Sequence, residues 1–382
     1  MNMHPVVLVH GLFGWGVDEL FGFNYWGEAE HVEGLGPRIF PSVGPISSLH
    51  DRACEVFYQL KGGTIDYGQE HANKFRHARF KNDKNGMPFN GYYREWDEQH
   101  PIHFVGHSMG APTIRMLQHL LATQAFEGYD TSANWVKSIS TISGVNNGST
   151  LVYMLGVSEE TGHIKPNSAV HFLVSVFEFL AAANNPLLKK IYDLDLEQWG
   201  LPRQPGEPLV QFLRRIANHT AFILGEDNAG YDLSIQGALR WNSIIQEHPH
   251  TYYFSYNTNQ TMRILMLPYS LPRPNMNPLL AASAYWMGHH TFDPPLYSGF
   301  HDADWWPNDG QVSVWSQEFP RIPTEHPHRG YIEGAAFVPG LWQVMPELTD
   351  WDHFDIVALP EPWQVQKQAQ FYKELFLRLS SL

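Results

Sequence analysis

The chain has 382 residues, enough to bury a large core in one elaborated domain or in two. Hydrophobic residues make up 43% and charged residues 17%, a composition that excludes a disordered protein. The formal net charge of −14, without a long basic run, argues against binding to nucleic acid or to an anionic membrane surface.

The N-terminus and the single cysteine bear on the cellular compartment. The opening MNMHPVVLVHG lacks the basic start of a signal peptide and passes directly into a predicted strand. No uninterrupted apolar run approaches the ~18 residues that a membrane helix needs, and Cys54 alone cannot form an internal disulfide. We expect the chain as given to be cytoplasmic or otherwise intracellular, not inserted in a membrane, and secreted only if a leader has been removed.

Predicted strands and helices alternate along the first part of the chain. Aliphatic and β-branched runs predict buried strands at 6–9, 102–105 and 135–143, and helical patterns occupy 51–60 and 111–122. This alternation predicts an α/β fold with a mostly parallel central sheet covered by helices on both faces.

Less regular segments interrupt and follow this pattern. The stretch of about 61–95 has no strong period and is interpreted as an inserted excursion, whereas 165–250 is mostly helical in pattern. After a strand within 250–258, residues 268–340 are rich in Pro, Trp and Gly and are typical of long functional loops, and 364–382 predicts an amphipathic helix. No internal repeat or clear linker is visible, so we expect one domain, residues 1–382, with insertions.

A serine between glycines follows the strand at 102–105. Gly106-His107-Ser108-Met109-Gly110 fits the Gly-x-Ser-x-Gly nucleophile elbow, a tight strand-to-helix turn that would leave no room for side chains at the glycine positions. The bare pattern is weak evidence, and an ordinary turn is the alternative. The preceding strand and the following helix favour the elbow, with Ser108 as nucleophile.

A serine hydroxyl needs a positioned base, and in this fold the acid and then the histidine follow it along the chain. His353, which precedes a strand-like run, is the favoured base, and His326 and His328 are its rivals in a Pro-rich loop. Asp309, followed by Gly310 and a predicted alternating strand, is the favoured acid, although Asn-Asp-Gly is also good turn chemistry. Asp302 and Asp304 remain open as alternatives.

An anion pocket requires two backbone N–H donors. In an elbow of this kind, one donor is the residue after the serine, here Met109. The glycine-rich HGLFGWG that ends the first strand is able to supply the second through Leu12, although the same glycines are compatible with a simple tight turn.

These blocks resemble the zinc-containing thermoalkalophilic bacterial lipases, a family of α/β-hydrolases. The likeness runs through most of the chain, from PVVLVHGLFGWG through FGFNYWG, DRACEVFYQLKGGTIDYGQEHANKFRHARF and YDLDLEQWGLPRQPGE to NDGQVSV and DHFDIV. It implies Ser108, Asp309 and His353 as the catalytic triad, with Leu12 and Met109 as oxyanion donors. One departure is the elbow itself, which has glycine first where those lipases have alanine.

The resemblance also implies metal sites. Its zinc ligands match Asp51, His71, His77 and Asp232, a closed nitrogen and oxygen set that suits a structural zinc. The spacing of the two histidines would not have suggested a site by itself. For the family's calcium site Asp355 is retained, but Pro360 stands for a ligand aspartate and Asn275 for a glycine, and Glu361 is the only substitute nearby. We therefore predict zinc and leave calcium open.

The family also closes its site with a helical lid, which implies a lid and cap region at about 165–225. Residues 168–185 carry a narrow polar stripe of His171, Ser175 and Glu178 on an otherwise apolar helix pattern. That pattern suits a lid that covers the site and contacts an apolar substrate, and a plain buried helix explains the pattern nearly as well.

These features predict a serine hydrolase that cleaves carboxylic esters, of lipase or esterase type, through an acyl-enzyme. An intracellular acyltransferase or lactone-forming or lactone-opening enzyme that acts on a specialised metabolite is the rival within the fold. A catalytically dead hydrolase fold used for binding is the rival outside it. The expected partner is a small-molecule ester or lipid substrate. The sequence indicates neither the acyl chain length nor the oligomeric state.

Overall fold

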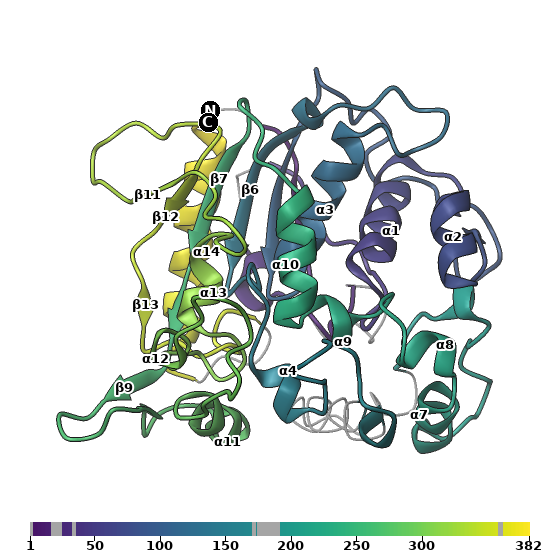
Figure 1. Cartoon of the computed structure of the whole chain (residues 1–382). Coiled ribbons are helices and arrows are strands. Elements are labelled where there is room, and N and C mark those ends of the chain that lie inside the picture. Colours follow the sequence, from purple (N-terminus) through teal and green to yellow (C-terminus); the bar gives the residue numbers. More distant parts are fainter. Residues whose placement is uncertain (1–2, 17–24, 33–35, 170–172, 174–191, 358–361) are drawn as a thin grey trace.

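A seven-stranded parallel sheet forms the centre of the protein (Figure 1). The computed structural model describes residues 3–16, 25–32, 36–169, 173, 192–357 and 362–382. Every strand pair in this sheet is parallel. In spatial order, the strands are β11 (His328–Gly330), β12 (Trp342–Val344), β7 (Tyr252–Tyr256), β6 (Val136–Ile142), β5 (Ile102–His107), β1 (Val6–Val9) and β2 (Arg38–Ile39).

The first strand shows why the sequence pattern was informative. Val6–Val9 are all buried, because β1 lies between β2 and β5 and its two faces are covered. The strands predicted at 6–9, 102–105, 135–143 and within 250–258 are confirmed as β1, β5, β6 and β7.

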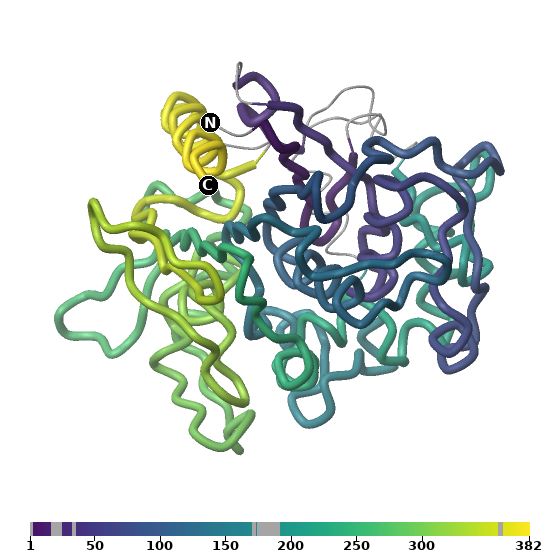
Figure 2. Tube along the Cα trace, turned by 90° about the horizontal axis from the view of Figure 1, so that it is seen from above, coloured from purple at the N-terminus to yellow at the C-terminus, as the bar shows by residue number. Residues whose placement is uncertain are grey.

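Helices cover both faces of the sheet. On one face lie α1 (Leu49–Lys61), α3 (Gly110–Ala122) and α10 (Ile235–Ile244), and on the other lies α14 (Val365–Ser380), as Figures 1 and 2 show together. The Ser48 side chain accepts a hydrogen bond from the Asp51 amide and so caps α1. The predicted helices at 51–60, 111–122 and 364–382 are confirmed.

Shorter elements occupy the excursion and the edges of the sheet. The excursion contains β3 (Ile65–Asp66), α2 (Gln69–Phe75) and β4 (Phe80–Lys81). The described part of 165–250 is mainly helical, with α7 (Leu209–Ala217), α8 (Thr220–Ile223), α9 (Ala229–Asp232) and α10. The remaining short helices are α4 (Leu151–Met154), α11 (Pro278–Met287), α12 (Asp302–Trp305) and α13 (Val314–Glu318). The remaining strands are β8 (Thr258–Asn259), β9 (Thr261–Arg263), β10 (Ser270–Pro272) and β13 (Leu348–Thr349), and 3-10 helices lie at Gly27–Glu30, Ala133–Trp135, Pro166–Ser168 and Glu197–Trp199.

The strand predicted directly after Asp309-Gly310 was wrong. Oδ1 of Asp309 accepts hydrogen bonds from the amides of Gln311 (3.0 Å) and Val312 (2.8 Å), which folds the chain into a turn, and α13 then begins at Val314. The apparent alternation in QVSV therefore belongs to a turn followed by a helix.

The strand-like run predicted after His353 is a turn in its described part, 354–357, and its remainder lies outside the described residues. Oδ1 of Asp352 accepts from the amides of Phe354 (2.9 Å) and Asp355 (3.2 Å), so the backbone turns through these residues instead of extending.

One large buried cluster extends from β1 to α14, and a single domain over residues 1–382 stays a prediction. In the part of the chain that the structure describes, no helix is both long enough and apolar enough to cross a membrane.

Candidate functional site

Ser108 stands on a strained turn between β5 and α3. Its backbone φ is +54°, a conformation that side-chain-bearing residues adopt only where the surroundings impose it. A Cβ on Gly110 would lie 2.0 Å from the Val9 carbonyl oxygen, and one on Gly106 would lie 2.6 Å from the Gly110 carbonyl oxygen. Both glycines are therefore required by close backbone approach, as expected for a nucleophile elbow.

Asp309 and His353 form a buried pair. His353 Nδ1 lies 2.8 Å from Asp309 Oδ2, and the His353 amide donates to the Asp309 carbonyl oxygen at 2.9 Å. The same carboxylate oxygen accepts from Thr258 Oγ1 at 2.8 Å and from Gln317 Nε2 at 3.3 Å. These contacts fix the carboxylate and hold the Nδ1 proton of the imidazole, which leaves Nε2 as the acceptor.

The pair lies beside the elbow. The His353 ring is 4.6 Å, between ring centroids, from that of His107, the residue that precedes Ser108. Thr258, which bonds to Asp309, follows the end of β7. The carboxyl edge of the sheet therefore brings together the C-terminal ends of β5 and β7 and the turns that contain Asp309 and His353. Ligands of open α/β sheets bind at this edge.

The rival residues have other partners. His326 Nδ1 lies 2.7 Å from Glu247, and the His328 ring stacks on Phe319 at 3.6 Å between centroids. Asp302 starts the short helix α12 and accepts from the Phe292 amide, and Asp304 is exposed on the same helix. None of these four makes a contact equivalent to that between Asp309 and His353.

The loop after β1 packs directly on the serine. A Cβ on Gly11 would lie 2.7 Å from Ser108 Cβ. The Gly11 amide donates to the Tyr25 hydroxyl at 2.9 Å, and this hydroxyl is 2.6 Å from His107 Nδ1. Tyr25 therefore links the loop to the elbow. Sequence reasoning missed this residue, which lies in the FGFNYWG block but has no pattern of its own.

The amides of Leu12 and Met109 face no competing acceptor. Within the described residues, neither N–H forms a backbone hydrogen bond, although the neighbouring Phe13 amide donates to the Pro45 carbonyl. An oxyanion requires backbone amides of this kind, without an acceptor of their own.

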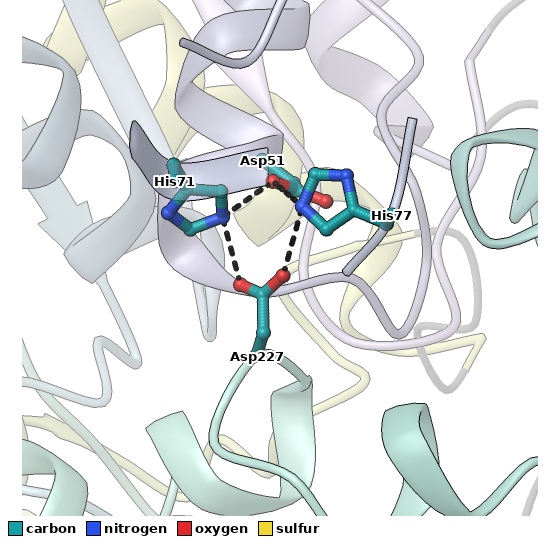
Figure 3. A group of neighbouring side chains, drawn as sticks. All are labelled: Asp51, His71, His77 and Asp227. Atoms are coloured by element: carbon teal, nitrogen blue, oxygen red, sulfur yellow. Dashed lines mark ion pairs between the residues drawn. The ribbon is translucent and has the colours of Figure 1, made fainter. Parts of the chain in front are cut away.

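A second cluster lies away from this edge, at the excursion. Asp51 of α1, His71 of α2, His77 and Asp227 direct their side chains toward one another (Figure 3), and one ligand atom from each lies within 4.8 Å of the others. His71 Nε2 is 3.1 Å from Asp51 Oδ1 and 3.2 Å from Asp227 Oδ1. His77 Nε2 is 3.3 Å from Asp227 Oδ2.

Asp227 occupies the position that the sequence analysis gave to Asp232, and that assignment was wrong. Asp232 Oδ2 accepts from the Leu49 amide at 2.7 Å and Oδ1 from Trp241 Nε1 at 2.5 Å. Burial raises the pKa of Asp232 to about 7, and it does not belong to the cluster. The two aspartates are five residues apart in GEDNAGYDL, and nothing in that stretch distinguishes a ligand from a structural carboxylate.

The chemistry of the four side chains fits a divalent cation. Asp51 Oδ1, Asp227 Oδ2 and both Nε2 atoms are buried without a hydrogen bond of acceptable geometry. His77 Nδ1 donates to the Ala78 carbonyl at 2.8 Å, which leaves the lone pair of Nε2 directed inward. Burial opposes the charged imidazole, yet the two carboxylates raise the pKa of His71 to about 10, because only positive charge balances them. The cluster is therefore a candidate metal centre.

The remaining predictions concern calcium and the lid. Asp355 Oδ2 accepts from the Asp352 amide at 2.9 Å, and Asn275 lies on an exposed turn, whereas Pro360 and Glu361 lie outside the described residues. Most of the predicted lid at 168–185, with His171, Ser175 and Glu178, also lies outside them.

The described end of the cap region contacts both sites. Tyr192 donates its hydroxyl proton to the Phe13 carbonyl at 2.8 Å, in the loop that carries Leu12. The Gln198 carbonyl accepts from the Ala78 amide beside His77, and Gln198 Nε2 donates to Asp51 at 3.0 Å.

A family model described as "Lipase-like, C-terminal domain" matches residues 2–379. The chain belongs to this family. It is 29% identical over 381 residues to "Lipase" of Staphylococcus hyicus and 29% identical over 369 residues to "Lipase 1" of Staphylococcus aureus strain MRSA252. Each match covers 94% of this chain but only 54% and 51% of the relative, so the chain spans about half the length of these curated relatives.

Solved structures give the same family and establish the α/β-hydrolase fold. EstA from Clostridium botulinum matches with a TM-score of 0.79 and 33% identity, over 100% of this chain and 88% of the other. Staphylococcus hyicus lipase matches with a TM-score of 0.78 and 28% identity, over 100% and 96%. Lipase 1 from Pelosinus fermentans matches with a TM-score of 0.77 and 32% identity, over 100% of both. The resemblance to bacterial lipases noted from the sequence is confirmed, whereas the zinc-containing thermoalkalophilic subtype stays a prediction, and these relatives lend no support to an intracellular location.

Proposed function

We propose that the protein is a serine hydrolase that cleaves carboxylic esters. The observation that carries this proposal is the serine at φ +54° at the carboxyl edge of the sheet, whose neighbour His107 lies 4.6 Å, between ring centroids, from a histidine paired with a buried aspartate. Membership of a lipase-like family supports the choice of an ester as substrate.

The roles of the residues follow from this geometry. Ser108 attacks the ester carbonyl carbon while His353 Nε2 takes the hydroxyl proton, and His353 then returns it to the leaving alcohol. Asp309 holds the imidazole by its Nδ1 proton and stabilises the imidazolium. The Leu12 and Met109 amides hold the oxyanion, and water releases the acid from the acyl-enzyme by the reverse sequence of proton transfers.

A serine-reactive fluorophosphonate tests this proposal on the intact protein. We expect one adduct, and mass spectrometry of a digest should place it on the peptide that contains Ser108, because only an activated hydroxyl reacts. The protein should also hydrolyse a short-chain nitrophenyl ester. Absence of both the adduct and turnover would identify a hydrolase fold used only for binding.

The same assay separates hydrolysis from acyl transfer. With an added alcohol, a hydrolase partitions the acyl group mainly to water, and the released acid accounts for the nitrophenol formed. Transfer of most acyl groups to the alcohol would favour the acyltransferase alternative instead.

We further propose that the cluster of Asp51, His71, His77 and Asp227 holds a structural zinc ion. Two imidazole nitrogens with two carboxylates make a four-coordinate set that suits zinc, and calcium and magnesium prefer oxygen ligands alone. Bound there, the ion neutralises the two carboxylates and joins α1, the excursion and the segment before α9. No step of ester cleavage requires it, because Ser108, His353 and Asp309 lie elsewhere.

Zinc content and stability distinguish the two aspartates. Elemental analysis should find about one zinc per chain in the intact protein and in Asp232→Asn, whereas Asp227→Asn should lose the metal. A ligand that binds only the folded state stabilises it by about 4 kcal/mol when its free concentration is a thousand times Kd. Chelation should therefore lower Tm in the intact protein and in Asp232→Asn, but leave Tm unchanged in Asp227→Asn.

Asp232→Asn serves as the matched control, because it changes a buried carboxylate only five residues away. Loss of zinc in Asp232→Asn with retention in Asp227→Asn would restore the assignment made from the sequence. A chain that contains no zinc and melts identically with and without chelator would exclude the structural ion.

A further inference from the structure

The hairpin formed by β9 and β10 carries apolar side chains into solvent. Its turn contains Ile264, Leu265, Met266 and Leu267, which we call the apolar tip. Leu265 is fully exposed and Met266 is 92% exposed. In Figure 1 the hairpin extends from the body of the molecule beyond β9, next to α11. Four consecutive exposed apolar residues are costly in water and mark a surface that contacts something else.

More apolar side chains continue this surface. Tyr269 follows the tip, and Leu279 and Tyr285 of α11 are each 52% exposed. α11 packs against β10, since the Ser270 amide donates to the Gly288 carbonyl at 2.9 Å. Together, these seven side chains concentrate exposed apolar area in one short part of the chain.

The charge of this region differs from that of the whole chain. The protein has 39 acidic residues and a net charge of −14, yet no Asp or Glu occurs between Glu247 and Asp293. The charged side chains of that stretch are Arg263, at the end of β9, and Arg273, one residue after β10, where its Nη1 lies 3.0 Å from Asp350 Oδ1. The surface is therefore apolar, with the cation of Arg263 beside it. This combination matches a lipid–water interface, in which the apolar side chains enter the acyl region and the guanidinium meets a headgroup phosphate.

The hairpin is attached rigidly to the proposed active site. The Asn308 amide, next to Asp309, donates a hydrogen bond to Thr261 Oγ1 of β9 at 3.1 Å. Ser283 of α11 donates to the Gly310 carbonyl at 2.6 Å. The tip thus emerges from the same edge of the sheet as the triad, and a surface that holds the tip also holds the site at a fixed position.

We propose that the apolar tip anchors the protein in a lipid–water interface and so presents the active site to aggregated ester substrate. This inference rests on the proposed function for its substrate but not for the anchoring itself. The apolar tip is narrow and convex, so a protein partner would need a matching pocket to bind it, whereas fluid lipid accommodates the tip without a preformed pocket. The hairpin and α11 contain no Asp or Glu, so the tip itself carries none of the negative charge that would be repelled by phosphate headgroups.

Flotation with phosphatidylcholine vesicles tests the anchoring directly. All proteins should carry Ser108→Ala, so that catalysis cannot alter the vesicles. The double variant Leu265→Ser/Met266→Ser should partition at least about tenfold more weakly, because burial of one such side chain alone is worth about a factor of ten. Met87→Ser, which changes an apolar side chain that is 61% exposed on the excursion, should partition like the parent.

Activity assays with Ser108 intact add an independent measurement. Hydrolysis of an emulsified triacylglycerol should fall in the double variant, and hydrolysis of a dissolved short-chain ester should not. If the parent binds vesicles through the tip but cleaves neither ester, the anchor stands and the proposed function fails.

Two results would overturn the anchor. One is equal vesicle binding by the parent and the double variant, or no binding by either. The other is a dimer in size-exclusion chromatography that the double variant converts to a monomer while vesicle binding is unchanged, which would make the tip a contact between copies of the chain.

Discussion

Ser108→Ala is expected to abolish covalent labelling by a fluorophosphonate and to lower kcat for a soluble ester by about 10⁶-fold. The size of this effect follows from the elbow. The strained backbone and the missing side chains of Gly106 and Gly110 hold Ser108 on a tight turn directly after His107, whose ring lies 4.6 Å from that of His353, and no other described serine combines these features. The free amides of Leu12 and Met109 would still leave a residual rate of roughly 10³–10⁴ over water.

The variant should fold normally, because the serine side chain makes no hydrogen bond that holds the turn together. Melting temperature and zinc content should equal those of the parent, which separates loss of the nucleophile from loss of the fold. Ser243→Ala is a suitable control, since Ser243 is exposed near the end of α10 and its hydroxyl donates to the Arg240 carbonyl. Retention of parental turnover in Ser108→Ala would remove the serine mechanism.

The sheet and the elbow were predictable because local sequence determines them. A strand buried on both faces requires continuous apolar residues, as in Val6–Val9, and the turn at Ser108 requires glycine where a Cβ would strike backbone. The helix ends were also close to prediction, since α1 begins directly after its Ser48 cap. In each case the constraint is visible in consecutive residues, although the backbone that Gly110 approaches is that of Val9.

The rest depended on contacts between distant segments. Asp227 and Asp232 differ only in what folds against them: Asp232 meets the Leu49 amide and Trp241, and Asp227 meets His71 and His77. Periodicity carries no information about such partners. The strand predicted after Asp309 failed for a similar reason, because its carboxylate bonds to backbone amides that the pattern assigned to a ladder.

The two sites share structural supports. α1 carries the metal-cluster residue Asp51 and, next to it, the buried Arg52, which donates to the Gly44 carbonyl at 3.0 Å and to the carbonyl of His10. His10 directly precedes the loop that packs on Ser108. The excursion contacts the same helix, since the Tyr67 hydroxyl donates to Glu55 at 2.8 Å. The candidate metal centre and the loop that packs on Ser108 are therefore both supported by α1.

Asp309→Asn should lower kcat by about 10⁴-fold while KM for a soluble ester changes little. In the parent protein, both oxygens of the Asp309 carboxylate accept hydrogen bonds. Oδ1 accepts from the Gln311 and Val312 amides, and Oδ2 accepts from Thr258, Gln317 and His353. An amide NH₂ placed at either position points a donor at other donors. Facing His353, it favours the imidazole tautomer that carries its proton on Nε2, and that tautomer cannot accept the proton of Ser108.

Asp302→Asn and Asp304→Asn are the controls for this variant, because they change the rival carboxylates and leave His353 untouched. Both should retain kcat within a few-fold, since neither side chain contacts the imidazole. In Asp309→Asn, one mismatched donor pair costs about 1–3 kcal/mol of stability. A melting temperature that nevertheless stays close to that of the parent would show that the activity loss reflects the tautomer rather than unfolding. A larger loss of kcat in Asp302→Asn or Asp304→Asn than in Asp309→Asn would assign the acid to α12. It would also leave the 2.8 Å contact between Asp309 and His353 without a catalytic role.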